Sequence, residues 1–257
     1  MISKAKIKYI RTLQSKKGRS TAEAFVAEGP KIVEELYPVF QPELLVATDR
    51  WLQIHQAMLL HHTSLGSEQI LTVSADELAK ASFQQHPQEV LAVFRQRKQH
   101  TALNVLQQLI IVLDGVQDPG NLGTIIRVAD WFGIEHIVCS NDTADVYNPK
   151  TVQATMGSIA RVQVRYTDLS EFFESLPTST PIYGTVLDGQ NIYREPLTTH
   201  GVIVMGNEGN GISDKIRKKI NRQLTIPRFA EDHESAQSLN VAIATAITCS
   251  EFKRRKL

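Results

Sequence analysis

The stretch IIVLDGVQDPGNLGTIIRVADWFG, residues 110–133, decides how the whole chain is interpreted. Residues 109–113 are a continuous apolar run, which predicts a buried strand, and they lead into Asp114 and a loop with two glycines and a proline. After Asn121 the apolar residues recur at helical spacing, with Arg127 among them. A strand, a glycine-containing turn and a helix in this order are typical of a ligand site at the carboxyl end of a parallel strand.

The composition is that of a globular protein with a core. Hydrophobic residues make up 42% of the 257 positions and charged residues 21%. The two cysteines, Cys139 and Cys249, match neither a metal-ligand spacing nor a disulfide framework, which favours a reducing compartment. No apolar run reaches the roughly 20 residues of a membrane span, and the N-terminus does not resemble a signal peptide. We therefore expect a cytoplasmic protein that has no membrane partner.

Basic residues are concentrated at the two ends of the chain. Residues 1–20 hold seven lysines and arginines and no acid, and residues 253–256 add four more. Of the 28 basic residues, 17 therefore remain in positions 21–252, against 27 acidic residues. Because lysine and arginine gain affinity for phosphates by releasing condensed counterions, basic ends favour a nucleic-acid partner. Basic termini that only keep the chain in solution are the alternative.

Residues 1–98 are predicted to form a small α/β unit. Its apolar runs predict strands at 24–29, 42–48, 69–74 and 88–95. Helices are expected over 3–15, after Pro30, over 50–60 and after Ser74, which forms a capping box with Glu77.

Residues 99–257 alternate strands and helices more regularly. Strands separated by helical segments predict a mainly parallel sheet that helices cover on both faces. Ligands of such sheets bind beyond the carboxyl ends of the strands, and three of these ends carry unusual loops, at 114–121, 206–211 and 227–240. The strands are expected at 109–113, 136–139, 161–166, 181–186, 201–205 and 223–226.

The closing helix is expected to begin near Leu239. The spacing of its apolar and small residues predicts one face that packs in the core. Ser238 and Asn240, at its start, both suit an N-terminal cap. The predicted core face comprises Leu239, Ala242, Ile243, Ala246, Ile247 and Ser250.

Several common ligand and catalytic motifs do not occur in this sequence. It contains no GxGxxG fingerprint, no GK[ST] of a P-loop and no GxSxG nucleophile elbow. The acidic run EDHE, residues 231–234, could ligate a metal, but adjacent polar residues in a loop are usually solvated, so no metal is expected. The glycine-rich loops favour a neutral or zwitterionic ligand that backbone groups hold, such as an adenine ring with an attached sulfonium.

Three motifs, in order, resemble those of the SPOUT-class RNA methyltransferases, in the SpoU/TrmH branch of ribose 2′-O-methyltransferases. They are DGVQDPGNLGTIIRVADWFG (114–133), VIVMGNEGNGIS (202–213) and IPRFAEDHESAQSLNVAIATAI (226–247). The twelve residues between Ile226 and Leu239 are more than is usual in that family and include no glycine. Residues 11–36 and 86–94 are similar to the substrate-binding domain, related to ribosomal protein L30e, that often precedes the catalytic domain.

The resemblance implies two domains, an RNA substrate-binding domain at 1–98 and a SPOUT methyltransferase domain at 99–257 whose C-terminal end forms a trefoil knot. It also implies S-adenosylmethionine as cofactor, without a metal, and a homodimer with the site near the subunit interface. Backbone of the second and third motifs would hold the cofactor. The implied cofactor-binding residues are Leu187, Gly206, Asn207, Glu208, Gly209, Ile226, Pro227, Ser238 and Leu239.

The resemblance further implies a catalytic set of Asn121, Arg127, Glu208 and Asn240. Arg127 has been assigned in this family to activating the ribose hydroxyl, but a guanidinium is a poor base at neutral pH. We therefore expect it to hold the adjacent phosphate and stabilise the developing alkoxide. Proton acceptance is open to Glu208, a water or a phosphate oxygen. Asn121 would orient Arg127 or the ribose, and Ser238 and Asn240 would hold the loop and the cofactor.

The alternatives for these residues are structural. Asn121 could cap a helix and Arg127 could form a surface ion pair. Expected RNA contacts besides Arg127 are Lys4, Lys6, Lys8, Lys16, Lys17 and Arg19.

The leading hypothesis is an enzyme that methylates a ribose 2′-OH in RNA, in ribosomal RNA of the 23S type rather than in tRNA. A second hypothesis is an RNA-binding protein of the same fold that has lost catalysis. A nicotinamide-dependent oxidoreductase is a third, and the missing dinucleotide fingerprint disfavours it.

Overall fold

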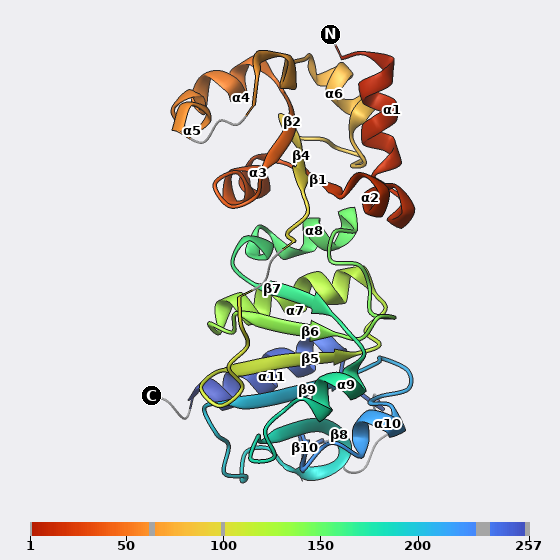
Figure 1. The fold of residues 1–257 in the computed structure, drawn as a ribbon, viewed down its shortest axis with the longest axis vertical. Coiled ribbons are helices and arrows are strands. Elements are labelled where there is room, and N and C mark those ends of the chain that lie inside the picture. The colour runs from red at the N-terminus through yellow and green to blue at the C-terminus, as the bar shows by residue number, and fades with distance from the viewer. Residues whose placement is uncertain (1, 62–64, 99–100, 230–236, 255–257) are drawn as a thin grey trace. The chain divides into compact units, whose positions relative to one another are not determined.

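The computed structural model describes residues 2–61, 65–98, 101–229 and 237–254, so the acidic run 231–234 lies outside the described residues. The chain divides into two compact units (Figure 1). Among the described residues, no helix is both long enough and apolar enough to cross a bilayer. Unit 1 comprises Met1–Gln99 and Asp145–Ala160, and unit 2 comprises His100–Ala144 and Arg161–Leu257.

Unit 1 is built on a four-stranded mixed sheet in the order β1-β4-β2-β3. The strand β4 is antiparallel to β1 and β2, while β3 is parallel to β2. The strands are β1 (Ala24–Glu28), β2 (Pro42–Ala47), β3 (Ile70–Thr72) and β4 (Val90–Arg95). The helices are α1 (Lys4–Thr12), α2 (Lys16–Ala22), α3 (Pro30–Leu36), α4 (Asp49–Ile54), α5 (Gln56–His61), α6 (Ala75–Ala81) and α8 (Pro149–Thr155), with short 3-10 turns η1 (Ser67–Gln69) and η2 (Ser158–Ala160).

The helices of unit 1 cover both faces of its sheet. α1 and α6 contact each other, and α3 packs against β1 and β4 on the other face (Figure 1). α8 lies against β1, and η2 lies against α3. The segment 145–160 therefore packs with the N-terminal elements, although the sequence had placed it in the second domain.

All four strands predicted for the N-terminal part are present, and the predicted capping box between Ser74 and Glu77 begins α6. The single helix expected over 3–15 is wrong, because the Ser15 side chain accepts a hydrogen bond from the Gly18 amide and starts a second helix. Gly18 suits this break, since a Cβ there would lie 2.0 Å from the Thr12 carbonyl oxygen. The helix expected over 50–60 is likewise two helices, α4 and α5, which separate at His55.

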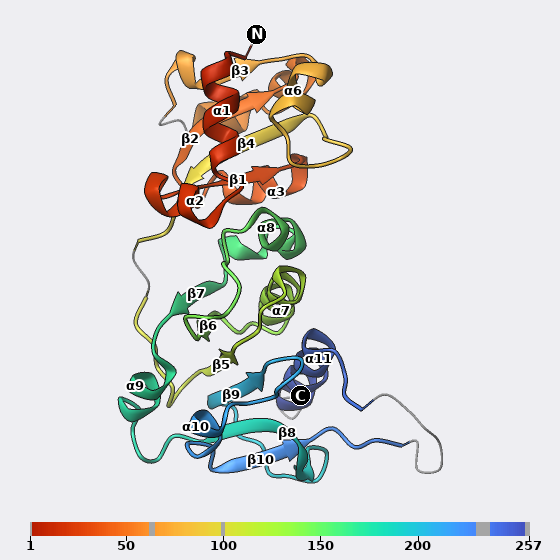
Figure 2. The same ribbon diagram turned by 90° about the vertical axis from the view of Figure 1, so that its right-hand side faces the viewer.

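Unit 2 contains a six-stranded sheet in the order β10-β8-β9-β5-β6-β7, with every pair of neighbours parallel. α7 and α11 lie on one face, and α9 and α10 lie on the other (Figure 2). This confirms the predicted α/β class and all six predicted strands. The strands are β5 (Leu109–Asp114), β6 (His136–Cys139), β7 (Gln163–Tyr166), β8 (Ile182–Asn191), β9 (Gly201–Gly206) and β10 (Arg222–Thr225); the helices are α7 (Pro119–Trp131), α9 (Leu169–Glu174), α10 (Asp214–Arg217) and α11 (Val241–Arg254).

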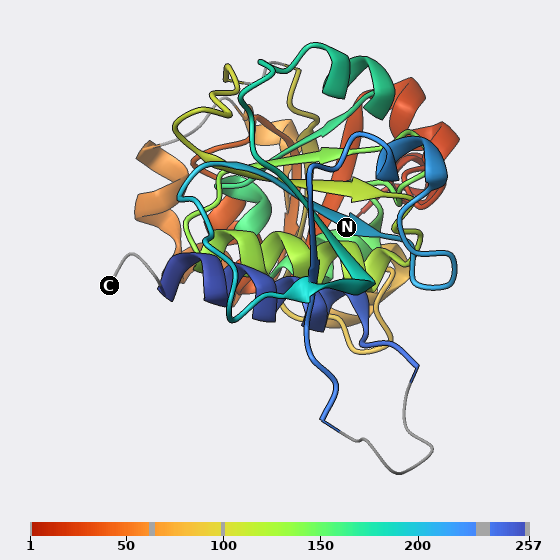
Figure 3. The ribbon, with the colours of Figure 1, turned by 90° about the horizontal axis from the view of Figure 1, so that it is seen from below.

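The two helices that flank the central strands pack side by side, with α11 along α7 (Figure 3). The core face predicted for α11 is partly wrong. Ile243 is 52% exposed and Leu239 is 49% exposed, because the helix turns a neighbouring stripe toward the sheet and α7. The buried residues of α11 are Val241, Ala242, Thr245, Thr248, Cys249, Glu251 and Phe252. The trefoil knot stays a prediction.

Candidate functional site

The candidate site lies at the carboxyl ends of β5 and β9, which are parallel neighbours with Asp114 opposite Gly206. Asp118 is the N-cap of α7, since its side chain accepts a hydrogen bond from the backbone N–H of Asn121 at 2.8 Å. The helix-cap role left open for Asn121 therefore belongs to Asp118. The Asp114 carboxylate accepts from the Ser213 amide at 2.8 Å, and this bond ties the loop after β9 to the end of β5.

Hydrogen bonds link three side chains, one from each of the three motifs. The Asn121 amide nitrogen donates to Glu208 Oε1 at 2.8 Å, and the Asn121 amide oxygen accepts from the Asn240 side-chain nitrogen at 2.9 Å. Both polar ends of the Asn121 amide are thus used by residues that are far away in the sequence. The structure brings together three of the four residues expected to be catalytic.

Arg127 lies on α7 but does not take part in the hydrogen bonds that link Glu208, Asn121 and Asn240. Its side chain is exposed and has no hydrogen bond or ion pair with any of the residues that the structure describes. The surface ion pair considered for Arg127 is therefore not found in that part of the chain, and Asn121 does not hold it. A cation that has no partner in the described part of the chain is available to an anionic ligand.

Asn207 organises the loop after β9. Its side-chain nitrogen donates to the Gly115 carbonyl at 2.7 Å, and its side-chain oxygen accepts from the amides of Gly209 and Asn210 at 2.9 and 3.0 Å. Gly206 permits the close return of the loop, since a Cβ there would lie 2.2 Å from the Gly211 carbonyl carbon. The sequence predicted Asn207 as a cofactor residue and gave no sign of this bracing role, because the partner at Gly115 is 92 positions away.

The third motif supplies the start of α11. Asn240 caps that helix, because its side-chain oxygen accepts from the Ala242 and Ile243 amides at 2.9 and 3.3 Å. Asn240 therefore caps α11 and also donates a side-chain hydrogen bond to Asn121. Ser238 is exposed and makes no side-chain hydrogen bond to any residue described, so the cap expected of it is wrong.

The other residues expected around the cofactor come from neighbouring segments. Ile226 and Pro227 follow β10 and are half-buried, whereas Leu187 is an exposed residue of β8. The Thr225 hydroxyl donates to the Leu187 carbonyl at 3.2 Å, which links these two segments. Near Glu208, Gly209 is exposed and Gly206 is half-buried. Backbone groups flanked by half-buried apolar side chains suit an adenine ring and a sulfonium.

The described residues of the site offer neither a group of metal ligands nor a cysteine nucleophile. Among the described residues, no three His, Cys, Asp or Glu side chains are grouped as a metal site would require. Burial raises the pKa of the Cys139 thiol far above its ordinary value, and it raises the pKa of the Cys249 thiol to about 12. Neither thiol is a nucleophile at neutral pH.

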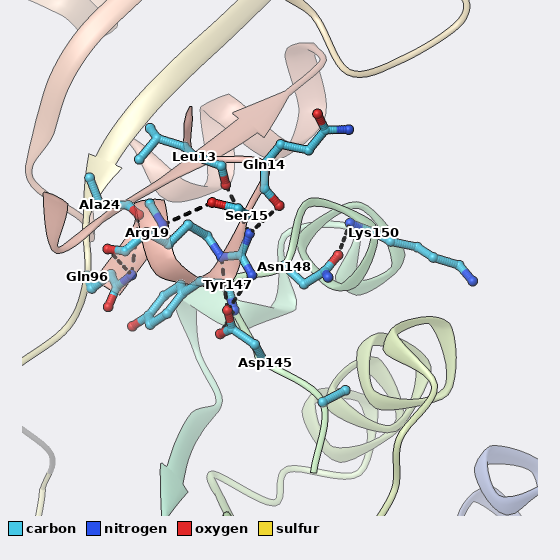
Figure 4. A network of polar contacts seen from close by, with 12 residues as sticks. Leu13, Gln14, Ser15, Arg19, Ala24, Gln96, Asp145, Tyr147, Asn148 and Lys150 are labelled. Carbon is cyan, nitrogen blue, oxygen red and sulfur yellow. Dashed lines mark hydrogen bonds and ion pairs between the residues drawn. The ribbon is translucent and has the colours of Figure 1, made fainter. Parts of the chain in front are cut away.

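The structure contradicts the RNA-binding role expected for Arg19. Its side chain is only 2% exposed and donates to the carbonyls of Leu13 and Gln14 and to the Asp145 carboxylate at 2.6 Å (Figure 4). Because every arm of the guanidinium has a partner inside unit 1, Arg19 has no free face for a phosphate. The reason could not be seen in the sequence, since Asp145 is 126 positions away.

The other basic residues expected to contact RNA differ in their surroundings. Lys4, Lys8, Lys16 and Lys17 are exposed on α1 and α2. Lys6 is half-buried, and its ammonium donates to the Glu68 carbonyl at 2.6 Å. Four of these five lysines therefore present their charge to solvent.

Comparison with known proteins agrees with this geometry. The model of the SpoU rRNA methylase family matches residues 108–250, and that of an MRM3-like substrate-binding domain matches residues 4–92. The chain is 31% identical to the 23S rRNA (guanosine(2553)-2′-O)-methyltransferase RlmP of Bacillus subtilis over 251 residues, covering 94% of this chain and 93% of the relative. These matches confirm the family resemblance seen in the three motifs.

Solved structures agree over nearly the whole length. A TrmH-family protein from Porphyromonas gingivalis is 39% identical, with a TM-score of 0.85 and 99% of each chain covered. An AdoMet-bound rRNA methyltransferase from Sinorhizobium meliloti is 28% identical, with a TM-score of 0.86 and coverage of 100% of this chain and 97% of that one. With the family model matching more than half of its residues, this chain belongs to the SpoU rRNA methylase family.

Proposed function

We propose that this protein transfers a methyl group from S-adenosylmethionine to a ribose 2′-hydroxyl of ribosomal RNA. The observation that carries the proposal is the hydrogen-bonded series Glu208–Asn121–Asn240, which joins the three family motifs, together with Arg127, which has no partner among the residues that the structure describes. Relatives named as 23S rRNA 2′-O-methyltransferases favour 23S rRNA as the substrate.

The chemistry requires a positioned hydroxyl and a site for its proton. Bound S-adenosylmethionine would supply an electrophilic methyl group and a neutral thioether leaving group. Arg127 would hold the adjacent phosphate and stabilise negative charge on the attacking oxygen. Asn121 occupies one carboxylate oxygen of Glu208, so the other oxygen could accept the hydroxyl proton as the oxygen–methyl bond forms.

The cofactor would be held at the edge formed by β8, β9 and β10. We assign to it the backbone near Gly206 and Gly209, the apolar side chains around Pro227, and Ser238, which has no other partner among the described residues. Asn207 would act through the loop that it braces. Leu187, Glu208, Ile226 and Leu239 complete the assigned set.

In the proposed function, residues 99–257 catalyse the reaction and residues 1–98 bind the RNA. The RNA-binding residues are Lys4, Lys6, Lys8, Lys16 and Lys17. The protein would act in the cytoplasm. We also propose a homodimer. Exposed apolar side chains on the paired helices α7 and α11 support it, since Trp131 is 85% exposed and Ile243 is 52% exposed. Exposed large apolar residues of this kind often mark a protein interface.

The proposal is tested with purified protein, labelled S-adenosylmethionine and 23S rRNA transcripts, followed by mapping of 2′-O-methyl sites. We expect methylation of one ribose in the transcript, and we expect the same ribose to be unmethylated in the RNA of cells that lack the protein. Calorimetric titration with S-adenosylmethionine distinguishes this enzyme from an RNA-binding protein of the same fold that has lost catalysis. The inactive protein would bind RNA but not the cofactor. A protein that binds the cofactor but leaves every ribose of rRNA unmodified would contradict the proposed reaction.

The lysines are tested together. Replacing all five by Ala should weaken RNA binding and lower the slope of log affinity against log salt by roughly 0.7 to 0.9 for each phosphate that is no longer neutralised. Cofactor affinity should stay constant. An unchanged salt slope would show that these lysines only keep the chain in solution.

A further inference from the structure

A cavity of about 410 Å³ opens in unit 1, outside the three family motifs. It lies where β1 begins and β4 ends, and its walls come from Glu23, the loop 39–41 and residues 95–98. Ligand sites of roughly 300–1,000 Å³ are typical of small molecules, so the cavity has room for one nucleotide.

One wall presents a cation that lacks a carboxylate partner. The Arg97 guanidinium lies 5.0 Å from the centre of the Phe40 ring, and its only side-chain hydrogen bond within the described part of the chain is to the Ala160 carbonyl at 3.0 Å. The other two cations of the cavity are paired, Lys98 with Glu23 and Arg95 with Glu43. Partial burial lowers the pKa of Arg97, because its surroundings solvate the charge poorly. An anion in the cavity would restore that solvation.

The rest of the lining suits a base rather than a bare anion. Val39 is 50% exposed and offers an apolar surface at the mouth of the cavity. Gln41 is exposed, and its side-chain amide has no partner among the residues described, so it can donate to and accept from a base edge. Gln96 also lines the cavity, and its side-chain nitrogen donates to the carbonyls of Arg19 and Ala24 (Figure 4).

Helix α2 connects two exposed lysines to the edge of the cavity. Helix α2 begins with Lys16 and Lys17, and its C-cap residue Glu23 lines the cavity. The seven residues of this helix span roughly 10 Å at 1.5 Å each. A polyanion bound along α2 would thus meet the cavity at its end.

We propose that this cavity holds one unpaired nucleotide of the RNA substrate, with its phosphate on Arg97 and its base against Val39 and Gln41. Sequence-specific RNA recognition typically places an unstacked base against apolar or guanidinium surfaces and hydrogen-bonds its edge. The inference rests on the proposed RNA methylation and names a second region of the protein that binds the same substrate.

The test compares binding of a 23S rRNA transcript to the full-length chain and to two variants that act by different means. Arg97→Gln removes the unpaired charge, and we expect affinity to fall roughly tenfold or more, as when one charged hydrogen bond is removed. Val39→Trp keeps every charge but fills the mouth of the cavity, and we expect a similar fall in affinity. Lys80→Gln and Ile54→Trp are matched controls at exposed positions of unit 1 and should bind like the parent chain.

A third variant should act in the opposite direction. Glu23→Gln frees Lys98 from its ion pair without emptying the cavity, so RNA affinity should rise. Photocrosslinking of a transcript that contains 4-thiouridine should label residues 39–41 or 96–98. Wild-type affinity in Val39→Trp, or crosslinks confined to other parts of unit 1, would overturn the inference. If the parent chain neither binds nor methylates 23S rRNA, the proposed function fails instead.

Discussion

The side-chain nitrogen of Asn240 donates to the side-chain oxygen of Asn121 at 2.9 Å, across 119 positions of sequence. The same Asn121 amide donates to Glu208, so its orientation is set from both sides. Three polar groups that would each be mobile alone are therefore held in one arrangement at the edge of the sheet. Preorganised polar groups of this kind stabilise charge without a cost of reorientation during the reaction.

Replacing Asn121 by Asp should disrupt this arrangement. The new carboxylate would face Glu208 without a donor, and the two negative charges would repel each other. We expect single-turnover methyl transfer to fall roughly 10²- to 10³-fold, on the scale of removing one oxyanion donor. Binding of S-adenosylmethionine should change little. Thr124→Ala, one turn further along α7, is the control, and a wild-type rate in Asn121→Asp would contradict the role assigned here.

Asn240 has two roles that substitutions can separate. Asn240→Ala should destabilise the protein by about 1 kcal/mol, because α11 loses its cap, and should slow methyl transfer. Asn240→Asp keeps a capping oxygen but loses the donor to Asn121, so stability should recover while activity stays low. Ser238→Ala should leave stability unchanged, since Ser238 caps nothing. Urea unfolding measures the first effect, and equal stability of all three variants would refute the cap.

Substitutions of Arg127 distinguish a role in charge stabilisation from a role in proton abstraction. If it holds phosphate, Arg127→Lys keeps the charge but loses the planar fork, and activity should fall roughly 10²- to 10³-fold. Arg127→Ala should fall further, and cofactor binding should persist in both. The rates are measured between pH 6 and 10. A lysine acting as base would recover steeply as the pH rises, since its ordinary pKa is near 10.4. A unit-slope rise confined to the lysine variant would restore Arg127 as the base.

Arg19 should matter for stability and not for RNA binding. Arg19→Met removes the donor to Asp145 Oδ2 and to two backbone carbonyls, and breaking a buried ion pair costs about 3 kcal/mol or more. Lys17→Met, on the same helix but exposed, should keep the parental unfolding midpoint and weaken RNA binding instead. Thermal or urea unfolding of both variants checks the difference, and similar midpoints would show that the Arg19 network contributes little.

Glu28 should make the stability of unit 1 depend on pH. Its carboxyl is buried against Ser82 and the Phe83 amide, and burial raises its pKa above the ordinary value. A raised folded-state pKa means that the contribution to stability is complete below the unfolded pKa and is lost as pH rises through the folded pKa. Glu28→Gln should remove this part of the pH dependence.

The measurement for Glu28 is urea unfolding at several pH values from 4 to 8. The exposed Glu68→Gln is the control and should retain the parental profile. An identical pH profile for Glu28→Gln and the parent chain would argue that folding does not raise the pKa of Glu28.

Much of the fold could be predicted from local pattern. The runs 109–113 and 201–205 are continuously apolar because central parallel strands are buried on both faces, and both became strands. Helix starts with a short polar side chain, such as Ser74, were also visible, because a cap and its amide partner are neighbours in sequence. The motif residues Asn121, Glu208 and Asn240 could be singled out for the same reason, since each stands in a short recognisable stretch.

Only the tertiary structure decided what these residues touch. Strand order places β9 beside β5, and that adjacency brings Glu208 to Asn121 although 87 positions separate them in the sequence. The same dependence on distant partners buried Arg19 against Asp145 and turned Ile243 of α11 outward. Local periodicity reports which residues are apolar, but the side that becomes buried depends on which elements pack together. That choice is made by the whole chain, because burial and side-chain hydrogen bonds depend on distances in space and not on separation in sequence.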